Sequence, residues 1–187
     1  MMHFFPTPYP DEILYSVLAR YSVRCGITSY QTIMESIFGK CSSRAVMEMP
    51  FNLNALVSNL PVNCPYTADD LIYNHTLYPF FTAFLPKERV EDIKQLMLSD
   101  GGRKIYGKAG IIGSRVPLNQ YLRFCPICLE QDKEQYGEGY WHRLHQIPFV
   151  MVCPVHKTFL HNSTVLVRGH NPQAYVPADN DNCIINE

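Results

Sequence analysis

Apolar side chains recur at intervals of three and four along the first hundred residues, and this period predicts a series of short amphipathic helices. The first helix is expected over residues 11–24, because the carboxylates of Asp11 and Glu12 suit the positive end of a helix dipole. Its apolar stripe consists of Leu14, Val17, Leu18 and Tyr21. Gly26 follows as a stop signal, so the helix is expected to end there.

Four further helices are expected before residue 101, because each apolar stretch has a start or stop signal beside it. Serine, asparagine and threonine satisfy free N–H groups at a helix start, whereas glycine and proline interrupt the helical backbone. The signals are Ser29 with Gly39, Asn52 with Pro61, Thr67 with Asp70 as a capping box, and Pro86 with Gly101. Residues 1–101 are therefore predicted to form a helical domain.

The first two predicted helices, 11–24 and 29–38, have the size and the tight connection of a helix-turn-helix pair. An ordinary helical bundle contains neighbours of the same size, so both arrangements stay open at this point. Few side chains of the second helix could donate hydrogen bonds to base edges, which weakens a role in reading a DNA groove. Those side chains are Gln31, Lys40 and Arg44.

The pattern changes after Gly101 and predicts a second, smaller module. Glycines at 107, 110 and 113 interrupt any helical period. Short strands are expected at Ile105, Tyr106, Ile111 and Ile112. We place a domain boundary near residue 101, the module over residues 102–170, and a loop-like tail over residues 171–187 that we expect to be the truncated start of a further segment.

Two pairs of metal-binding residue types lie in the smaller module. They are Cys125-Pro-Ile-Cys128 and Cys153-Pro-Val-His156, with 24 residues between them. A turn that contains proline lets both side chains of a pair converge on one ion, and three thiolates with one imidazole form a known structural zinc set. We predict one structural Zn²⁺ held by Cys125, Cys128, Cys153 and His156. Four protein ligands leave no position open for water or substrate.

Other uses of these residues stay open on the sequence alone. A disulfide within the first pair is conceivable, although no thioredoxin-like pattern accompanies it. A nucleophilic cysteine in the second pair leaves the first pair unexplained. His142 and His145 form a rival ligand pair, but their two-residue gap is shorter than the usual three to five residues. A zinc hydrolase needs an open coordination position, which the closed set disfavours.

The apolar and aromatic residues between the two pairs are expected to form a small core of the zinc-binding module. They are Tyr136, Tyr140, Trp141, Phe149, Val150, Met151 and Val152. The predicted fold class is thus α+β, mainly α. A helical, helix-turn-helix-like domain precedes a small zinc-finger module with short strands.

Composition and charge refine this picture. The chain has 187 residues, of which 47% are hydrophobic and 18% charged, so it is no disordered tail. A net charge of −1 argues against a strongly basic nucleic-acid-binding protein, but residues 102–170 carry nine basic and four acidic side chains. A basic run there leads into the first cysteine pair, and we predict that it contacts DNA phosphates. It comprises Arg103, Lys104, Lys108, Arg115 and Arg123.

The cysteine count and the N-terminus bear on the compartment. Seven cysteines with uneven spacing do not suggest a secreted disulfide framework. The first residues lack a signal-peptide pattern, and no apolar run approaches the ~20 residues of a membrane span. We therefore expect a soluble, cytoplasmic protein.

Several motifs follow one another in a fixed order over residues 4–160. They are Phe5-Pro-Thr-Pro-Tyr, Asp11-Glu12-Ile13-Leu14-Tyr15, Leu71-Ile72-Tyr73-Asn74-His75, Arg123-Phe124-Cys125-Pro-Ile-Cys128, Tyr136-Gly137-Glu138-Gly139-Tyr140-Trp141 and Cys153-Pro-Val-His156. In this order they resemble the TniQ/TnsD family, the bacterial target-site selection proteins of Tn7-like transposons. The resemblance covers most of the chain and carries the four zinc ligands over onto the two Cys/His pairs.

The resemblance implies an adaptor without catalytic activity. Family members bind target DNA, directly or through an RNA-guided complex, and recruit the AAA+ ATPase that regulates the transposase. TnsD-type members are much longer, and their C-terminal part contributes to site recognition. We therefore expect these residues to need a further C-terminal region for site specificity. The alternative function is a zinc-stabilised DNA-binding transcription regulator, because a helical domain with a zinc module also serves that role.

Overall fold

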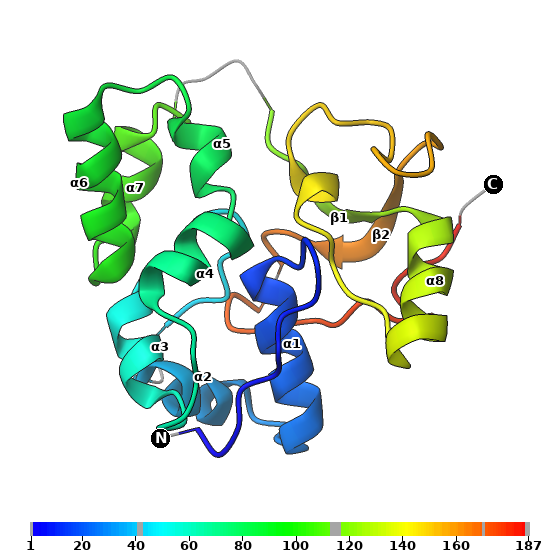
Figure 1. Ribbon diagram of the computed structural model, residues 1–187, viewed down its shortest axis with the longest axis horizontal. Helices are drawn as coiled ribbons and strands as arrows, with labels where there is room; N and C mark the ends of the chain where they lie inside the picture. Colours follow the sequence, from blue (N-terminus) through cyan, green and yellow to red (C-terminus); the bar gives the residue numbers. More distant parts are fainter. Residues whose placement is uncertain (1, 41–42, 113–116, 170, 186–187) are drawn as a thin grey trace.

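The chain folds into eight α-helices, one 3₁₀-helix and two β-strands in the part that the computed structural model describes, residues 2–40, 43–112, 117–169 and 171–185 (Figure 1). In chain order they are α1 (Leu14–Cys25), α2 (Tyr30–Phe38), α3 (Leu53–Asn59), α4 (Ala68–His75), α5 (Tyr78–Thr82), α6 (Lys87–Leu98), α7 (Gly102–Lys108), β1 (Tyr121–Phe124), α8 (Pro126–Tyr136), η1 (Leu144–Gln146) and β2 (His161–Leu166). This arrangement confirms the predicted α+β fold that is mainly α.

The ends of the early helices follow the local signals in the sequence. Gly26 and Gly39 end α1 and α2 in the left-handed conformation, with φ of 63° and 66°. The Ser29 hydroxyl accepts a hydrogen bond from the backbone N–H of Thr32, and Thr67 forms the predicted capping box at α4. Short-range chemistry therefore sets these boundaries, whereas the helix-turn-helix geometry of α1 and α2 stays a prediction.

The start of α1 differs from the prediction. Asp11 and Glu12 lie before the helix, which begins at Leu14, and no acidic residue occupies its first turn. Asp11 lies in a turn with φ of 56°, and Glu12 forms an isolated antiparallel bridge with His142. The N–H of Ile13 donates to the carbonyl of Trp141 over 3.1 Å. The position of Asp11 and Glu12 is therefore fixed by pairing with a distant segment and not by the dipole of α1.

Residues 102–108 form helix α7, so the prediction of a strand at Ile105 and Tyr106 was wrong. A glycine inside a helix costs about 1 kcal/mol. Full burial of an isoleucine side chain contributes about 1.5–3 kcal/mol, and Ile105 is completely buried where α7 packs on α6. Ile112 is 71% exposed and belongs to no strand. The domain boundary near residue 101 stays a prediction, and helical packing continues through residue 108.

The two strands lie in the last third of the chain and pair antiparallel, with Arg123 opposite Asn162 and Phe124 opposite His161. Between them the chain forms α8, η1 and a hairpin over residues 151–160. Figure 1 shows α8 and the sheet on one side of α1, and α5, α6 and α7 on the other. Helix α1 therefore separates the helical part from the part that carries the Cys/His pairs.

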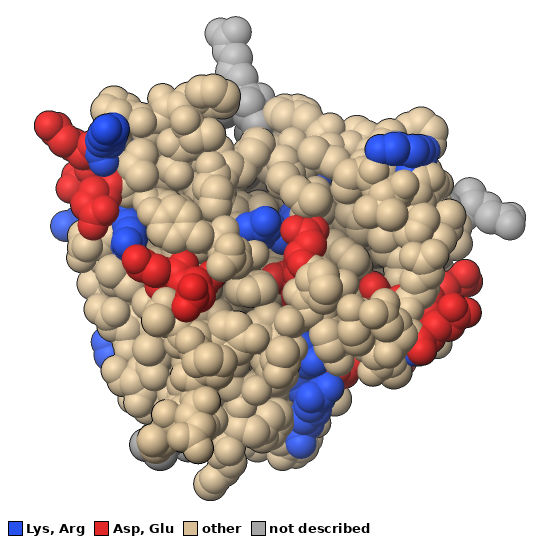
Figure 2. Space-filling model, in the orientation of Figure 1, with Lys and Arg blue, Asp and Glu red and all other residues tan. Residues whose placement is uncertain are grey.

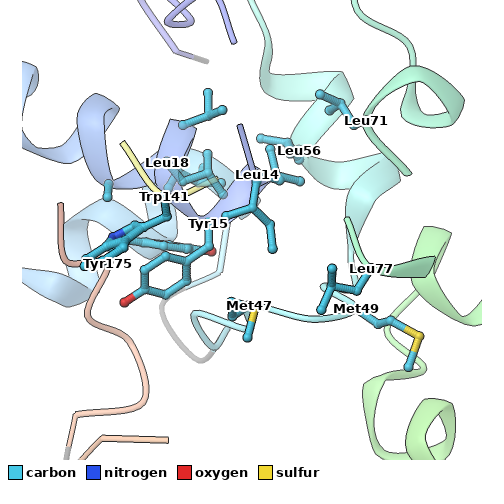
Figure 3. Close-up of a cluster of buried hydrophobic side chains, with 14 of the residues drawn as sticks. Leu14, Tyr15, Leu18, Met47, Met49, Leu56, Leu71, Leu77, Trp141 and Tyr175 are labelled. Carbon is cyan, nitrogen blue, oxygen red and sulfur yellow. The ribbon is translucent and has the colours of Figure 1, made fainter. Parts of the chain in front are cut away.

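One buried cluster extends across both parts of the molecule. Leu14, Leu18 and Leu56 of the helical part share it with Trp141 and Tyr175 (Figure 3). Trp141 belongs to this cluster rather than to a separate zinc-module core, and Phe149 is 61% exposed. The predicted aromatic core is therefore wrong in part. Around the cysteines only a small cluster forms, from Cys125, Cys128, Cys153 and Leu160 with Val150.

The tail has no helix or strand among its described residues, as expected of a loop, but it is firmly packed. The Tyr15 hydroxyl donates to the carbonyl of Ala174 over 3.0 Å and accepts from the N–H of Val176 over 3.1 Å. The indole N–H of Trp141 donates to the carbonyl of Val176 over 2.8 Å. Residues 171–185 thus connect α1 to the chain around Trp141.

No helix among the described residues is long and apolar enough to cross a membrane.

Candidate metal centre

The first Cys/His pair lies where β1 meets α8. Cys125 is the residue just before the helix, Pro126 begins it, and Cys128 lies in its first turn. A helix N-terminus presents free N–H groups and a positive dipole end, both of which favour thiolates. The local sequence therefore places both sulfurs at the position on α8 where negative charge is best tolerated.

The second pair lies on the hairpin over residues 151–160. The N–H of Cys153 donates to the carbonyl of Thr158 over 2.8 Å, and the N–H of Leu160 donates to the carbonyl of Met151 over 2.8 Å. The turn between them is closed by Lys157, whose φ is 57°. The hairpin brings Cys153 and His156 back toward α8.

The ligand atoms of Cys125, Cys128, Cys153 and His156 all lie within 4.8 Å of one another. His156 Nδ1 lies 3.6, 3.3 and 3.7 Å from the sulfurs of Cys125, Cys128 and Cys153, and the sulfurs of Cys128 and Cys153 are 3.7 Å apart. Tetrahedral Zn²⁺ with metal–sulfur bonds of about 2.3 Å and metal–nitrogen bonds of about 2.0 Å requires separations of about 3.8 Å and 3.6 Å. The observed spacing fits one tetrahedral ion.

The same geometry bears on the alternatives. All three sulfurs belong to free cysteines, so the structure contains no disulfide within the first pair. Cys153 and His156 lie against the other pair rather than alone, so a separate nucleophile pair finds no support. The buried Cys₃His group could bind a metal ion.

The second ring nitrogen of His156 has its own partner. Nε2 lies 3.0 Å from Oε1 of Gln131 on α8. An amide oxygen accepts a hydrogen bond, so Nε2 carries the proton and Nδ1 presents its lone pair to the three sulfurs. Histidine ligands of metals are usually fixed in this way.

Burial favours the thiol form of two of these cysteines, Cys125 and Cys128. Burial, together with the neighbouring Cys125, raises the pKa of the Cys128 thiol far above its ordinary value, and burial also raises the pKa of Cys125. At Cys153 burial acts in the same direction, but the backbone N–H groups of His156 and Val155 bring its pKa below the ordinary value. A bound cation would offset the repulsion among the sulfurs and allow all three to ionise.

The rival histidine pair has other contacts. Nε2 of His142 lies 2.8 Å from a carboxylate oxygen of Asp132, and the rings of His142 and His145 lie 4.7 Å apart. Nε2 of His145 lies 3.9 Å from Cys128 Sγ, outside the group of four ligand atoms. Burial, assisted by His142 and Arg123, lowers the pKa of His145 to about 3, so its ring is neutral at pH 7.

A buried ion-pair network joins α1 to the chain that follows the C-terminal end of α8. Arg20 of α1, 3% exposed, donates to Glu12 and to Glu138, each over 2.8 Å, and its guanidinium lies 3.7 Å from the ring centre of Tyr9. Arg24 also contacts Glu138, over 2.5 Å. This network has no signal in the sequence, because its members lie up to 129 residues apart with no local pattern between them.

The network explains several residues of the motifs quoted above. Gly137 ends α8 in the left-handed conformation with φ of 80°, and Glu138 then reaches Arg20. A Cβ atom on Gly139 would lie 2.9 Å from the carbonyl oxygen of Ala178, so only glycine fits there. The two motifs that start at Asp11 and at Tyr136 meet in space. We call this contact, formed by Tyr9, Glu12, Arg20, Arg24 and Glu138, the joint.

Glu12 is the most deeply buried carboxylate of the joint, with no solvent exposure. Burial raises its pKa to about 7, although Arg20 and the N–H of Tyr9 oppose that shift. One of its oxygens, Oε1, has no hydrogen-bond partner among the described residues. Glu12 is therefore the member of the joint that is most sensitive to the loss of its cation.

The predicted basic run is split by the fold. Arg103 and Lys104 are exposed on α7 and form no ion pair with any described residue, whereas Lys108 pairs with Asp92 of α6. Arg123 is 5% exposed and donates to the carbonyl of Ile147, so its guanidinium is no part of an exposed basic surface. Arg115 lies outside the described residues. On the face that Figure 2 shows, basic side chains are scattered in small groups among acidic ones.

Comparison with known proteins gives two findings. A family model described as TniQ matches residues 3–160, which include both Cys/His pairs and the joint. The chain is also 32% identical over 155 residues to the transposon Tn7 transposition protein TnsD of Escherichia coli. That alignment covers 83% of this chain and 30% of TnsD, so the chain spans less than a third of that relative's length.

Proposed function

This chain belongs to the TniQ family, and from that premise we propose that it selects target sites for a Tn7-like transposon. In this role it binds target DNA, directly or through an RNA-guided complex, and recruits the AAA+ regulator of the transposase. It performs no catalysis itself and works in the bacterial cytoplasm. The match over residues 3–160 is the observation that supports this most, because it spans helices, joint and Cys/His pairs together.

We propose that the metal is a single structural Zn²⁺. Three sulfurs and one imidazole nitrogen at tetrahedral spacing are a donor set that suits zinc. The ion would connect the start of α8 to the hairpin over residues 151–160, where the apolar cluster is small. Structural zinc supplies about 10–16 kcal/mol of apparent binding free energy in zinc-finger peptides, enough to hold such a segment folded.

The exposed basic side chains of α7 are the proposed DNA contacts. Arg103 and Lys104 are free to reach phosphates. Lys108 can give up its exposed ion pair with Asp92 and bind a phosphate instead. Each phosphate neutralised contributes about 0.9 to the slope of log affinity against log salt, so these three residues predict a slope of about −2 to −3. Such contacts carry no sequence information, which agrees with site specificity residing in a further region.

A binding experiment tests the recruitment step. The zinc-loaded chain is immobilised and incubated with the purified AAA+ regulator of the same transposon, with and without ATP and DNA. We expect stoichiometric retention of the regulator, and loss of retention for Cys128→Ser. Cys64→Ser, which replaces a half-buried cysteine outside the Cys₃His group, is the matched control and should retain it.

The same experiment separates the two functions considered for this chain. A transcription regulator binds DNA without any contribution from the ATPase. The adaptor proposal would therefore be contradicted if the chain still binds DNA but retains no regulator under any of the four conditions.

A further inference from the structure

A second buried histidine lies directly beside one of the proposed ligands. His145 of η1 is 2% exposed, and its Nε2 lies 3.9 Å from Cys128 Sγ. It is not one of the four ligand atoms, because the proposed set is complete with His156. Its position is that of a group that contacts a ligand rather than the metal.

The surroundings of the ring fix which nitrogen carries the proton. A neutral imidazole has one N–H and one lone pair. Nδ1 of His145 is buried and has no hydrogen-bond partner among the described residues. A proton on Nδ1 would leave a buried donor unpaired and would point the Nε2 lone pair at the sulfur. A proton on Nε2 instead gives Cys128 a donor, so this tautomer is favoured.

The ring is held in this place from α8, the helix that carries Cys128. Asp132 lies one helical turn after Cys128, hence on the same face, and its carboxylate is 2.8 Å from Nε2 of His142. The His142 ring lies against the ring of His145, with centres 4.7 Å apart. The amide of Gln146 further fixes the segment, since it donates to the carbonyl of Arg123 over 2.8 Å.

We propose that His145 is a positioning residue of the metal centre, whose Nε2–H donates to the Cys128 thiolate when the metal is bound. This inference rests on the metal site proposed above. A donor to a coordinated thiolate fixes the direction of the sulfur and withdraws part of its charge. Because it stabilises the ionised sulfur and fixes its direction, it favours metal binding, and because it withdraws charge, it slows attack of the sulfur on electrophiles.

Three variants at one position test the role. His145→Phe keeps an aromatic ring but removes the donor. His145→Gln places its amide nitrogen close to the position of the histidine Nε2, whereas the shorter side chain of His145→Asn cannot reach Cys128 Sγ. His75→Phe, which removes a half-buried histidine that contacts the carbonyl of Glu12, is the control for loss of a buried ring nitrogen.

Three readouts are measured on the whole chain: zinc affinity by chelator competition, the rate of zinc release by iodoacetamide, and the charge-transfer spectrum after Co²⁺ substitution. Loss of such a contact typically weakens metal binding 10–100-fold. We expect at least about tenfold weaker binding, faster release and a shifted sulfur-to-cobalt band for Phe and Asn. Gln and the His75 control should stay within about twofold of the wild type.

The outcomes are distinct. Equal behaviour of Gln and Asn would show that only packing matters and would overturn the inference, as would wild-type values for all three variants. If Phe fails to fold, the comparison of Gln with Asn decides alone. Metal content of the wild-type chain is measured first: wild-type protein without metal refutes the zinc proposal and this inference together, whereas loaded wild type with indifferent variants refutes only the role of His145.

Discussion

Replacement of Arg20 by Met isolates the electrostatic contribution of the joint. Methionine keeps most of the apolar stem of the arginine and removes the charged guanidinium with its hydrogen bonds. Arg20 is 3% exposed and is the cation closest to Glu12, which has no solvent exposure. The substitution therefore leaves a carboxylate buried without its counter-ion.

The expected cost is large. Removal of one partner of a buried ion pair destabilises proteins by about 3–5 kcal/mol, because the remaining charge cannot reach water. The exposed pair between Lys40 and Asp100 provides a matched control, with side chains 51% and 62% exposed. Loss of such a surface pair costs about 0–1 kcal/mol.

The pH dependence distinguishes this mechanism from a packing defect. Burial raises the pKa of Glu12 from 4.5 to about 7, so the folded chain holds this proton more tightly than the unfolded chain. The free energy of unfolding therefore falls between about pH 4.5 and 7, by about 3 kcal/mol from this group alone. Without Arg20 the pKa of Glu12 rises further. The deficit of Arg20→Met should thus be smallest near pH 5 and largest above pH 8.

Urea unfolding at pH 5.5 and pH 8.5 measures both quantities. Far-UV circular dichroism follows the helices, and fluorescence follows Trp141, the single tryptophan, which is buried beside the joint. Arg20→Met combined with Glu12→Gln removes both charges and should regain most of the stability at pH 8.5. A deficit that does not change with pH, or that is no larger than that of Lys40→Ala, would refute this reasoning.

Three further predictions follow from the structure. Cys128→Ser should release the metal and unfold the start of α8 and the hairpin over residues 151–160, which protease mapping and metal analysis detect, while most of the helical circular dichroism remains. Gly139→Ala should destabilise the chain by about 1–3 kcal/mol, since its Cβ would meet the carbonyl of Ala178. Gly107→Ala is the control: its Cβ faces open space inside α7, so it should stabilise the chain by about 0.5–1 kcal/mol, as measured by thermal unfolding. Arg103→Ala should lower the salt slope of DNA binding by about 1 without loss of stability, and an unchanged slope would exclude its phosphate contact.

Features with a short-range cause could be predicted from the sequence. The helix ends at Gly26 and Gly39, the cap at Ser29 and the capping box at Thr67 each depend on residues within one helical turn. The Cys/His pairs belong to the same class, because each pair is spaced by a turn of its own. Their meeting across 24 residues follows from the chemistry of a shared ion.

Features with a long-range cause could not be predicted from the sequence. The glycine-rich sequence around Ile105 indicates an interrupted segment, and only packing on α6 makes it a helix. Arg123 looks like an exposed base beside the cysteines, yet the pairing of β1 buries it, with the carbonyl of Ile147 as its acceptor. The joint depends on the contact between Glu138 and Arg20, which are 118 residues apart in the sequence, and no local pattern predicts that contact.

Mapping of transposon insertions tests the target-selection role most directly. The transposase and AAA+ regulator are supplied with the wild-type chain, with Cys128→Ser, or with neither, and insertion sites are sequenced. The proposed function predicts that the number or distribution of insertions depends on the wild-type chain and that this dependence is lost with Cys128→Ser. An unchanged number and distribution of insertions in all three conditions would contradict it.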